Sequence, residues 1–468
     1  MNQKLQVQDK LTGKLYDRSK IDFAHLLFDT RALWMLLIPV IIEQLLNSLM
    51  GMADTMMVSR VGSAAMSAVS LVDSINILVI QIFAALATGA AIVCSQYLGK
   101  GDEPGANRAA RQIFLTVLVI SVTLMAVCLI FYKPLLRLVF GQVEPLVMQN
   151  SVVYFVVTVL SYPFIALFHA GAAFYRSGGN SKFPMKVSML SNVLNIAGNA
   201  VLIFGMKLGV EGAAIATLFS RVFCAVVVLA TLSKNKGQPI VLNRYFSIRP
   251  ELALIGTVLA IGIPSGIENG MFQFGKLAIQ STISTLGTAN IAAQAMTIIF
   301  ENLNSMTGVG VGIAMMTVIG QCIGADRREE ARYYICKLSL YAEILTVISC
   351  LLVFAISRPV MYLAGMEPES MRITYELILA ITVVKPFGWT LAFIMPYGLR
   401  AAGDVRFSMF VSICTMWFCR VMLAIFLMRT TDIGPMGAWI GMFVDWTLRA
   451  FIFAGRYVSG AWMKKRIV

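Results

Sequence analysis

The stretch SQYLGKGDEPGAN, residues 95–107, decides the fold because the chain contains a second version of it. GQCIGADRREEAR, residues 320–332, repeats Gln96 as Gln321 and Gly99 as Gly324, each 225 residues later. The same spacing relates positions along both halves of the chain, pairing Pro39 with Pro264, Glu43 with Glu268, Gly62 with Gly287, Pro134 with Pro359 and Gly212 with Gly437. Self-similarity at a fixed period indicates a repeated structural unit, so we predict two copies of one fold.

The composition indicates that both copies lie in a membrane. Of the 468 residues, 58% are hydrophobic and 13% are charged, with a mean hydropathy of +0.78. Several apolar stretches reach the roughly 20 residues that a helix needs to cross the hydrocarbon layer. Because lipid offers the backbone no hydrogen-bond partners, these spans must be helices. We therefore predict an all-α membrane protein with twelve transmembrane helices in two pseudo-symmetric lobes of six.

The predicted domain boundaries follow from the spans and the repeat. We expect a cytoplasmic N-terminal segment (1–30), an N-terminal lobe (31–232), a cytoplasmic linker (233–250), a C-terminal lobe (251–459) and a cytoplasmic tail (460–468). An even number of spans in each lobe keeps the two copies in the same orientation. Lys and Arg gather in alternate connections, so the positive-inside rule places both termini in the cytoplasm of a multi-pass protein of the cytoplasmic membrane.

The net charge of +14 does not indicate nucleic-acid binding, because the basic residues are spread over short connections between apolar runs. We expect the lipid bilayer and small organic substrates as partners, no nucleic acid, and a monomer. GMFQFGKL, residues 270–277, resembles the start of a phosphate-binding loop but lacks Ser or Thr after Lys276. The two histidines, His25 and His169, form no catalytic pattern. We therefore expect a protein that is not an enzyme and has no cofactor besides a coupling ion.

Two like halves around a midplane cavity are what alternating access requires, so secondary transport is the leading class of function. The first span, PVIIEQLLNSLMGMADTMMVSR at residues 39–60, places Glu43, Asn47 and Asp54 on one stripe of a helix. An ionisable residue within a membrane is costly, and an ion or proton pathway is the usual reason to keep one.

The repeat separates the two carboxylates. Asp54 matches Ile279, so the fold itself does not demand an acid there, and we predict a cation or proton site at Asp54. The alternative is an interfacial residue that is solvated near the outer end of its helix or paired with a basic group such as Arg60. Glu43 recurs as Glu268, so it serves either ion coupling or a hydrogen bond between helices that both halves need.

The fifth span carries Asn192, Asn195 and Asn199 on one face, at spacings of three and four. Amide oxygens beside Asp54 could complete a Na⁺ site made of Asp54, Asn195 and Asn199. The alternative for these amides is hydrogen bonding between packed spans.

The second half offers candidates for a substrate cavity. On the seventh span Asn269, Gln273, Lys276 and Gln280 form a single polar stripe, although Lys276 could instead snorkel to the membrane surface. Glu268, Glu301 and Lys385 are further candidates for the same cavity. Asp445 and Arg449, four residues apart, are expected to neutralise each other.

These features together resemble the MATE (multidrug and toxic compound extrusion) family of antiporters, and most closely its DinF-like branch. The likeness lies in PVIIEQLLNSLMGMADTMMVSRVG, in SQYLGKGD with its repeat GQCIGADR, in FYRSGGNSKFP with its repeat GLRAAGDVRFS, and in NVLNIAGNAVLIFG followed by LGVEGAAIAT. The resemblance implies two six-helix lobes forming a V, and export of organic, often cationic and amphipathic compounds in exchange for Na⁺ or H⁺.

The resemblance also implies an ion site in the N-terminal lobe, with Asp54 of the ADT motif, Asn195 and Thr217. The family often has an aspartate where this chain has Asn199. Either Asp54 then works with amide ligands alone, or Glu43 supplies the second charge. A lipid-linked saccharide flippase of the same superfamily is the alternative function, for which we would expect a more basic cavity. The substrate and the choice between H⁺ and Na⁺ stay open.

Overall fold

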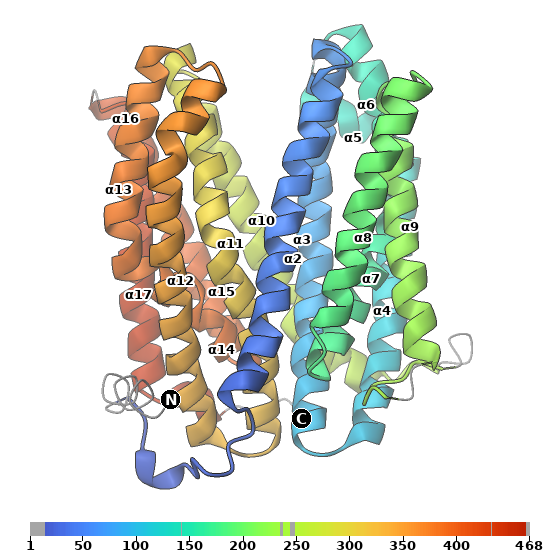
Figure 1. Cartoon of the computed structure of the whole chain (residues 1–468), viewed down its shortest axis with the longest axis vertical. Helices are drawn as coiled ribbons and strands as arrows, with labels where there is room; N and C mark the ends of the chain where they lie inside the picture. Colours follow the sequence, from blue (N-terminus) through green and yellow to red (C-terminus); the bar gives the residue numbers. More distant parts are fainter. Residues whose placement is uncertain (1–14, 142, 235–236, 244–248, 432, 465–468) are drawn as a thin grey trace. The chain divides into compact units, whose positions relative to one another are not determined.

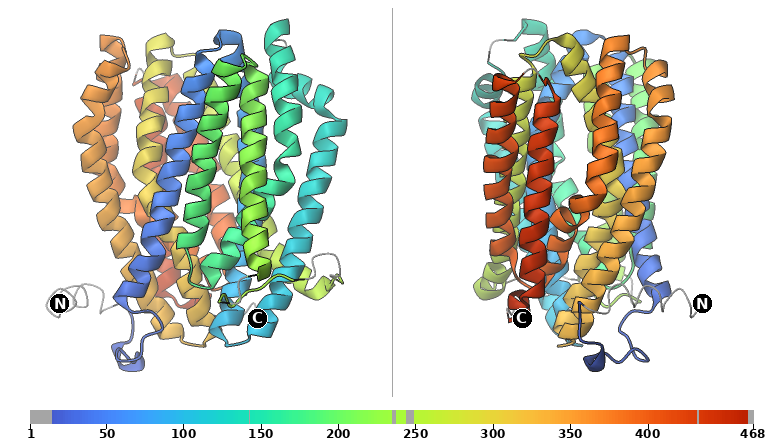
Figure 2. Two further views of the ribbon diagram at one scale, coloured as in Figure 1. Left: turned by 45° about the vertical axis from the view of Figure 1, so that its right-hand side comes forward. Right: turned by 90° about the vertical axis from the view of Figure 1, so that its left-hand side faces the viewer.

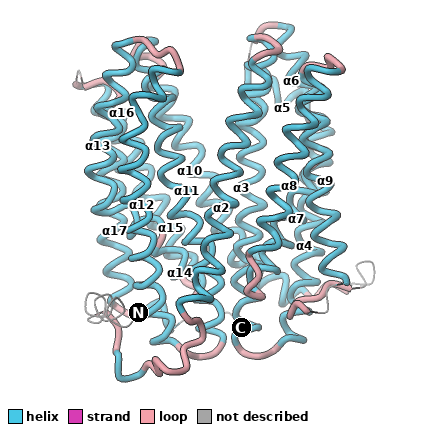
Figure 3. The backbone as a smooth tube through the Cα atoms, viewed as in Figure 1, coloured by secondary structure: helices cyan, strands magenta, loops and turns pink. Residues whose placement is uncertain are grey.

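The computed structural model describes residues 15–141, 143–234, 237–243, 249–431 and 433–464. Parts of the predicted N-terminal segment, linker and tail therefore lie outside the described residues. Within the described ranges all regular structure is helical (Figure 3).

Within each half, the helices from α2 to α9 and from α10 to α17 follow one another with short connections (Figure 1). The first half contains η1 (Arg18–Lys20), α2 (Thr30–Ser59), α3 (Ser63–Gly99), α4 (Glu103–Ile130), α5 (Tyr132–Phe140), α6 (Pro145–Leu160), α7 (Tyr162–Ser177), α8 (Lys182–Asn199), the π-helical turn η2 (Ala200–Gly205) and α9 (Val210–Lys234). The second half contains α10 (Leu252–Ile283), α11 (Thr288–Gly324), α12 (Arg328–Leu363), α13 (Pro368–Phe393), α14 (Met395–Ala401), α15 (Val405–Thr415), the π-helical segment η4 (Met416–Met422), α16 (Leu423–Thr430), α17 (Met436–Val458) and η5 (Ala461–Lys464).

The internal repeat is confirmed in the secondary structure. Helices α3 and α11 each have 37 residues and begin and end at positions that the repeat equates. Each follows a glycine with positive φ, 142° at Gly62 and 95° at Gly287. The turn after each helix also contains a residue of positive φ at the matched position, Gly101 in the first half and Asp326 in the second. Aspartate is among the few side chains that adopt this conformation readily.

The chain forms two compact units whose boundaries fall inside α2 and α10. Unit 1 comprises Met1–Leu45 and Ile267–Val468, and unit 2 comprises Leu46–Gly266. In unit 2 the first part of α10 packs on α3, where a β-carbon added to Gly262 would lie 3.1 Å from Leu86 Cδ2. In unit 1 the first part of α2 packs on α11, where a β-carbon added to Gly310 would lie 2.9 Å from the Ile41 Cα atom. Each unit therefore includes the beginning of the other half's first span, and the lobe boundaries 31–232 and 251–459 stay a prediction.

The predicted spans exist as helices, although not all are equally apolar. Among the described residues, ten helices are long and apolar enough to cross a membrane, or eleven if α6 and α7 form one span. That pair bends by 43° at Ser161, and Pro163 lies in the first turn of α7. The last predicted span is the 23-residue α17, which carries Asp445, Arg449 and Arg456. Within each unit the long helices run lengthwise beside one another, as α8 and α9 do in unit 2 (Figure 2).

Candidate functional site

The candidate coupling residues Asp54, Asn195, Asn199 and Thr217 form one hydrogen-bonded chain in unit 2, across α2, α8 and α9. The Asn199 Nδ2 atom donates to Asp54 Oδ1 at 2.7 Å and to Asn195 Oδ1 at 3.2 Å. The Asn195 Nδ2 atom donates to Thr217 Oγ1 at 3.4 Å. The sequence prediction thus grouped four side chains that the fold brings together.

The local structure explains how these side chains meet. Residues 195 and 199 are one turn apart on α8, and both side chains are buried, while Asp54 and Thr217 are half-buried. The Asn199 Oδ1 atom is buried and accepts no hydrogen bond from the described residues. A buried carbonyl oxygen without a donor is costly to keep. Together with the carboxylate, amide and hydroxyl oxygens beside it, this atom gives the group the oxygen-rich chemistry that a hard cation prefers.

A second carboxylate, Asp73 on α3, lies close to Asp54 and was not among the residues predicted from the sequence. Asp73 Oδ1 accepts hydrogen bonds from Asn76 Nδ2 at 3.1 Å and from the Tyr154 hydroxyl at 3.3 Å. The Tyr162 hydroxyl donates in turn to Asn76 Oδ1 at 2.9 Å. Helices α3, α6 and α7 therefore hold Asp73 in place.

The charge of this group is unbalanced. Asp54 and Asp73 lie close enough to repel each other, and Arg221 of α9 attracts both. Arg221 Nη1 also donates to Ser161 Oγ at 2.7 Å, at the bend between α6 and α7. Two carboxylates thus face one guanidinium group. We call Asp54, Asp73, Asn76, Tyr154, Asn195, Asn199, Thr217 and Arg221 the carboxylate cluster.

The repeat could have identified the residues that the sequence analysis missed. Asp73 matches Ile298 and Arg221 matches Trp446, so neither charge is required by the fold they share. Asp54 was selected by the same criterion, namely that the matching position in the other half carries no charge. The structure thus places a further carboxylate on the second span, while the two options raised by the sequence, Asp54 with amide ligands alone or Glu43 as the second charge, stay predictions.

Glu43 lies on the same helix as Asp54, but on the other side of the boundary between the two compact units. It is buried and belongs to unit 1, whereas Asp54 belongs to unit 2. No ion pair among the described residues joins Asp54 to Arg60, the partner considered in the alternative interpretation. Asn192 on α8 donates to Asn47 Oδ1 of α2 at 3.4 Å, and Ser188 donates to the same oxygen at 2.9 Å. These bonds show the packing role that was the alternative for the fifth-span amides.

In unit 1 the candidate cavity residues Glu301 and Lys385 form an ion pair. Lys385 Nζ lies 3.0 Å from Glu301 Oε1 and donates to Ser305 Oγ at 2.8 Å. Lys385 is fully buried, and its ammonium lies 4.4 Å from the centroid of the Trp389 ring. Helices α11 and α13 are therefore joined by a charge pair in which the lysine is buried and the glutamate half-buried.

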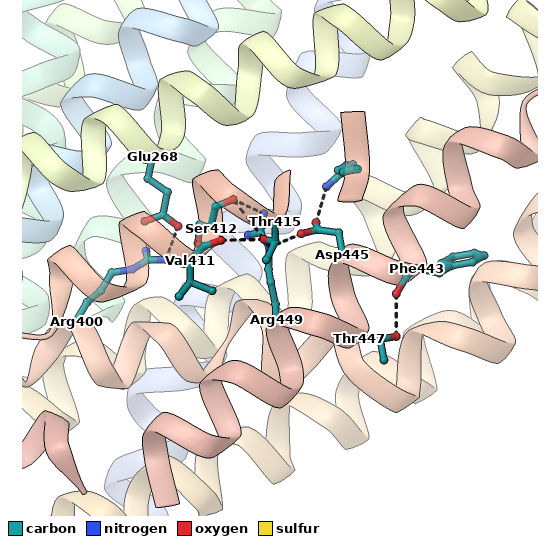
Figure 4. Close-up of polar contacts among 10 residues, drawn as sticks. Glu268, Arg400, Val411, Ser412, Thr415, Phe443, Asp445, Thr447 and Arg449 are labelled. Atoms are coloured by element: carbon teal, nitrogen blue, oxygen red, sulfur yellow. Dashed lines mark hydrogen bonds and ion pairs between the residues drawn. The ribbon is translucent and has the colours of Figure 1, made fainter. Parts of the chain in front are cut away.

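The other predicted residues of unit 1 lie on neighbouring helices. Glu268 of α10 pairs with Arg400 of α14 at 3.0 Å (Figure 4). The predicted neutralisation of Asp445 by Arg449 is confirmed by a 2.6 Å contact between Arg449 Nε and Asp445 Oδ1, shown in the same figure. Lys276 is exposed on α10, and Gln273 and Gln280 are half-buried on that helix.

Comparison with known proteins decides the family. The family model MatE matches residues 39–201 and 264–426, two segments related by the 225-residue repeat. The chain belongs to the MatE family.

The relatives of this MatE chain match it almost from end to end. The uncharacterized transporter YisQ of Bacillus subtilis is 29% identical over 441 residues, covering 93% of this chain and 96% of that protein. The probable multidrug resistance protein NorM of Thermotoga maritima is 26% identical over 448 residues, covering 92% and 93%. A solved structure described as the outward-facing conformation of a multidrug resistance MATE family transporter is similar with a TM-score of 0.82 and 23% identity, covering 93% and 96%.

This MatE chain is therefore a multi-pass membrane transporter with the two-lobe MATE fold. The names of the relatives do not favour a lipid-linked saccharide flippase, the alternative raised by the sequence. The assignment to the DinF-like branch stays a prediction.

Proposed function

We propose that this transporter is a secondary antiporter that exports organic, amphipathic compounds across the cytoplasmic membrane in exchange for H⁺ or Na⁺. The observation that carries the proposal is the carboxylate cluster of unit 2. It combines two acids, one basic group and a series of amide and hydroxyl oxygens within a span-forming, apolar helix bundle. An intramembrane charge imbalance of this kind is typical of an ion pathway.

The chemistry of the cluster supports binding of one cation. Two carboxylates opposite one guanidinium leave one negative charge, which either a proton or a sodium ion can neutralise. Sodium would find oxygen ligands in Asp54, Asn195, Asn199 and Thr217, the last three through their amide and hydroxyl groups. A proton would need only a carboxylate oxygen.

Binding of the cation can drive export because it changes the relative free energy of two conformations. A cation that binds one state more tightly shifts the population toward it, by an amount limited to the difference in affinity. A shift from 1:99 to 99:1 requires about 5.5 kcal/mol of differential binding. Neutralising an otherwise uncompensated carboxylate in a low-dielectric site is a change of suitable size. Cation binding then favours release of the substrate to the outside, and the cation leaves to the inside.

We also propose the orientation and the oligomeric state. The distribution of Lys and Arg supports cytoplasmic termini, and a single chain that carries both halves supports a working monomer. Labelling of single cysteines introduced at the termini, with a reagent that does not cross membranes, tests the orientation. Light scattering of the purified protein tests the mass.

Gradient-driven efflux tests the proposed function. Proteoliposomes loaded with tetramethylrhodamine methyl ester, a fluorescent organic cation, receive either an inward sodium gradient or an inward proton gradient. We expect one gradient to drive efflux by the native protein, and Asp54→Asn to abolish that response. Efflux that ignores both gradients would refute coupling, and unchanged coupling in Asp54→Asn would remove the cluster from the mechanism.

A further inference from the structure

Unit 1 contains a second group of charged residues, separate from the carboxylate cluster, arranged around three aromatic rings. Phe272 of α10 meets Phe393 of α13 edge to face at 6.3 Å, and Phe393 stacks on Trp389 at 5.6 Å. Each ring lies beside at least one cation. We call this group, together with its charged neighbours, the aromatic-cation group.

Four cations surround these rings. The guanidinium of Arg449 lies 5.0 Å from the Phe393 centroid, and the ammonium of Lys385 lies over Trp389. Phe272 has two cations, Lys276 Nζ at 5.0 Å and Arg420 Cζ at 4.8 Å from its centroid. Contacts of this kind are attractive because the face of an aromatic ring is electronegative.

Carboxylates neutralise only two of these cations. Glu301 pairs with Lys385, and Asp445 pairs with Arg449, which also donates to Thr415 Oγ1 at 2.8 Å (Figure 4). Each acid has one close partner, although Glu301 also attracts Lys276 and Arg420 over a longer distance, and Asp445 also attracts Arg420.

Lys276 and Arg420 are left without a close counter-ion. Arg420 lies 3.9 Å from Asp445, which it shares with Arg449, and its buried Nε atom has no hydrogen-bond partner among the described residues. Lys276 forms no ion pair within the described ranges. The two cations are close enough to repel each other, and the four cations of the group face only two carboxylates, Glu301 and Asp445, which leaves two positive charges in excess. Such charges within a membrane-spanning unit are costly and indicate a function.

The backbone at Arg420 supports the same conclusion. Arg420 lies in the π-helical segment η4, between the α-helices α15 and α16. Single π-helical turns inside α-helices occur frequently at functional sites.

We propose that Lys276 and Arg420 form a binding site for the carboxylate of an aromatic, amphipathic substrate. The planar guanidinium fork of Arg420 matches a carboxylate, and its unpaired Nε is a donor already oriented by the fold. Lys276, exposed on α10, supplies the second charge. Phe272 and the two rings packed beside it, Phe393 and Trp389, offer an apolar surface for the aromatic part of the substrate.

This inference deepens the proposed function by naming a substrate class. A substrate with both an amine and a carboxylate would bind better than the same molecule without its carboxylate. The transporter would then favour zwitterionic or anionic aromatic compounds over simple organic cations.

A matched pair of dyes tests the site without requiring transport. Tetramethylrhodamine carries a free carboxylate, and tetramethylrhodamine methyl ester is the same cation with that charge removed. Fluorescence anisotropy of each dye, titrated with the purified full-length protein in lipid nanodiscs, gives two dissociation constants. We expect the free acid to bind about tenfold more tightly than the ester, as one charge-assisted contact would give.

Variants identify the residues responsible. Lys276→Gln and Arg420→Gln should each bring the ratio of the two dissociation constants toward one by weakening only the acid. Arg358→Gln is the matched control, because Arg358 also lies over a ring, Tyr375 at 4.1 Å, but outside the aromatic-cation group. Since Arg420 is buried, Lys276→Gln at an exposed position keeps the test valid if Arg420→Gln misfolds.

The outcomes separate this inference from the proposed function. Equal affinity for both dyes, no binding of the acid, or a preference that survives in Lys276→Gln would overturn the carboxylate site. None of these results bears on coupling, which is tested by whether a sodium or proton gradient drives efflux of the ester and whether Asp54→Asn abolishes that response.

Discussion

Replacing Asp73 by Asn provides a direct test of the carboxylate cluster, because the sequence analysis did not include this residue. The amide keeps the size of the side chain and can still accept from Asn76 and Tyr154, so the helices should stay in place. The charge that opposes Arg221 is lost, and Asp54 becomes its only carboxylate partner in the cluster. A coupling cation would then have to compete with Arg221 for a single acid.

The size of the effect follows from the interaction removed. A charge-assisted contact in a partly buried site contributes about 1.5–3 kcal/mol. At about 1.4 kcal/mol for each factor of ten, Asp73→Asn should weaken the apparent affinity for the coupling cation by roughly 10- to 100-fold. Arg221→Gln should change the affinity in the opposite direction, because it removes the competing positive charge while retaining a donor for Ser161.

The assay is the concentration of Na⁺ or H⁺ that gives half-maximal dye efflux from proteoliposomes. Glu211→Gln serves as the matched control, because Glu211 is an exposed acid in the first turn of α9 in the same unit. An unchanged cation requirement in Asp73→Asn would refute the two-carboxylate account. A shift of the same sign in Asp73→Asn and Arg221→Gln would also refute it, since the electrostatic argument requires opposite signs.

Three further predictions test the cluster, the ion pair of Lys385 and the packing. Asn199→Asp adds a carboxylate beside Asp54 and should lower the half-maximal cation concentration in the efflux assay about tenfold; an increase would contradict a cation site there. Glu301→Gln leaves Lys385 buried without its counter-ion and should destabilise the protein by about 3–5 kcal/mol, measured by thermal unfolding in detergent. Glu376→Gln is the control, because it breaks the exposed pair with Arg372 and should cost at most about 1 kcal/mol. Gly89→Val forces a β-carbon to 3.0 Å from the Val258 carbonyl oxygen and should lower the unfolding temperature. Gly256→Val should leave the unfolding temperature unchanged, because no heavy atom lies within 4 Å of the added carbon.

Much of the fold could be predicted from the sequence, because the repeat and the hydropathy act over long stretches. Matched pairs such as Gly62 and Gly287 correspond to the same turn in both halves. The bend between α6 and α7 and the π-helical segment η4 could not be predicted, since they depend on local packing that leaves the apolar pattern unchanged. The assignment of the first part of α2 to unit 1 could not be predicted either. The repeat shows which spans correspond in the two halves, but not which helices each span packs against.

The candidate site was predictable where residues shared one helix or belonged to a motif of the MATE family. The spacing of Asn195 and Asn199 and the motif around Asp54 were enough to group them. Asp73 and Arg221 belong to neither of these patterns, so only the folded bundle shows that they lie close to Asp54. Likewise, Lys276 was recognised on its own helix, but its proximity to Arg420 depends on how α10 and η4 pack.

The account depends most on the exchange of substrate for cation, so the movement of the cation itself is the most direct measurement. Proteoliposomes are loaded with tetramethylrhodamine methyl ester and placed in dye-free buffer, without an imposed cation gradient. Uptake of radioactive sodium, or alkalinisation of the outer medium reported by a pH dye, is then followed. The account predicts that the outward dye gradient drives one of these cations inward, and that Asp54→Asn and Asp73→Asn reduce this flux. Dye efflux with no accompanying movement of either cation would contradict it.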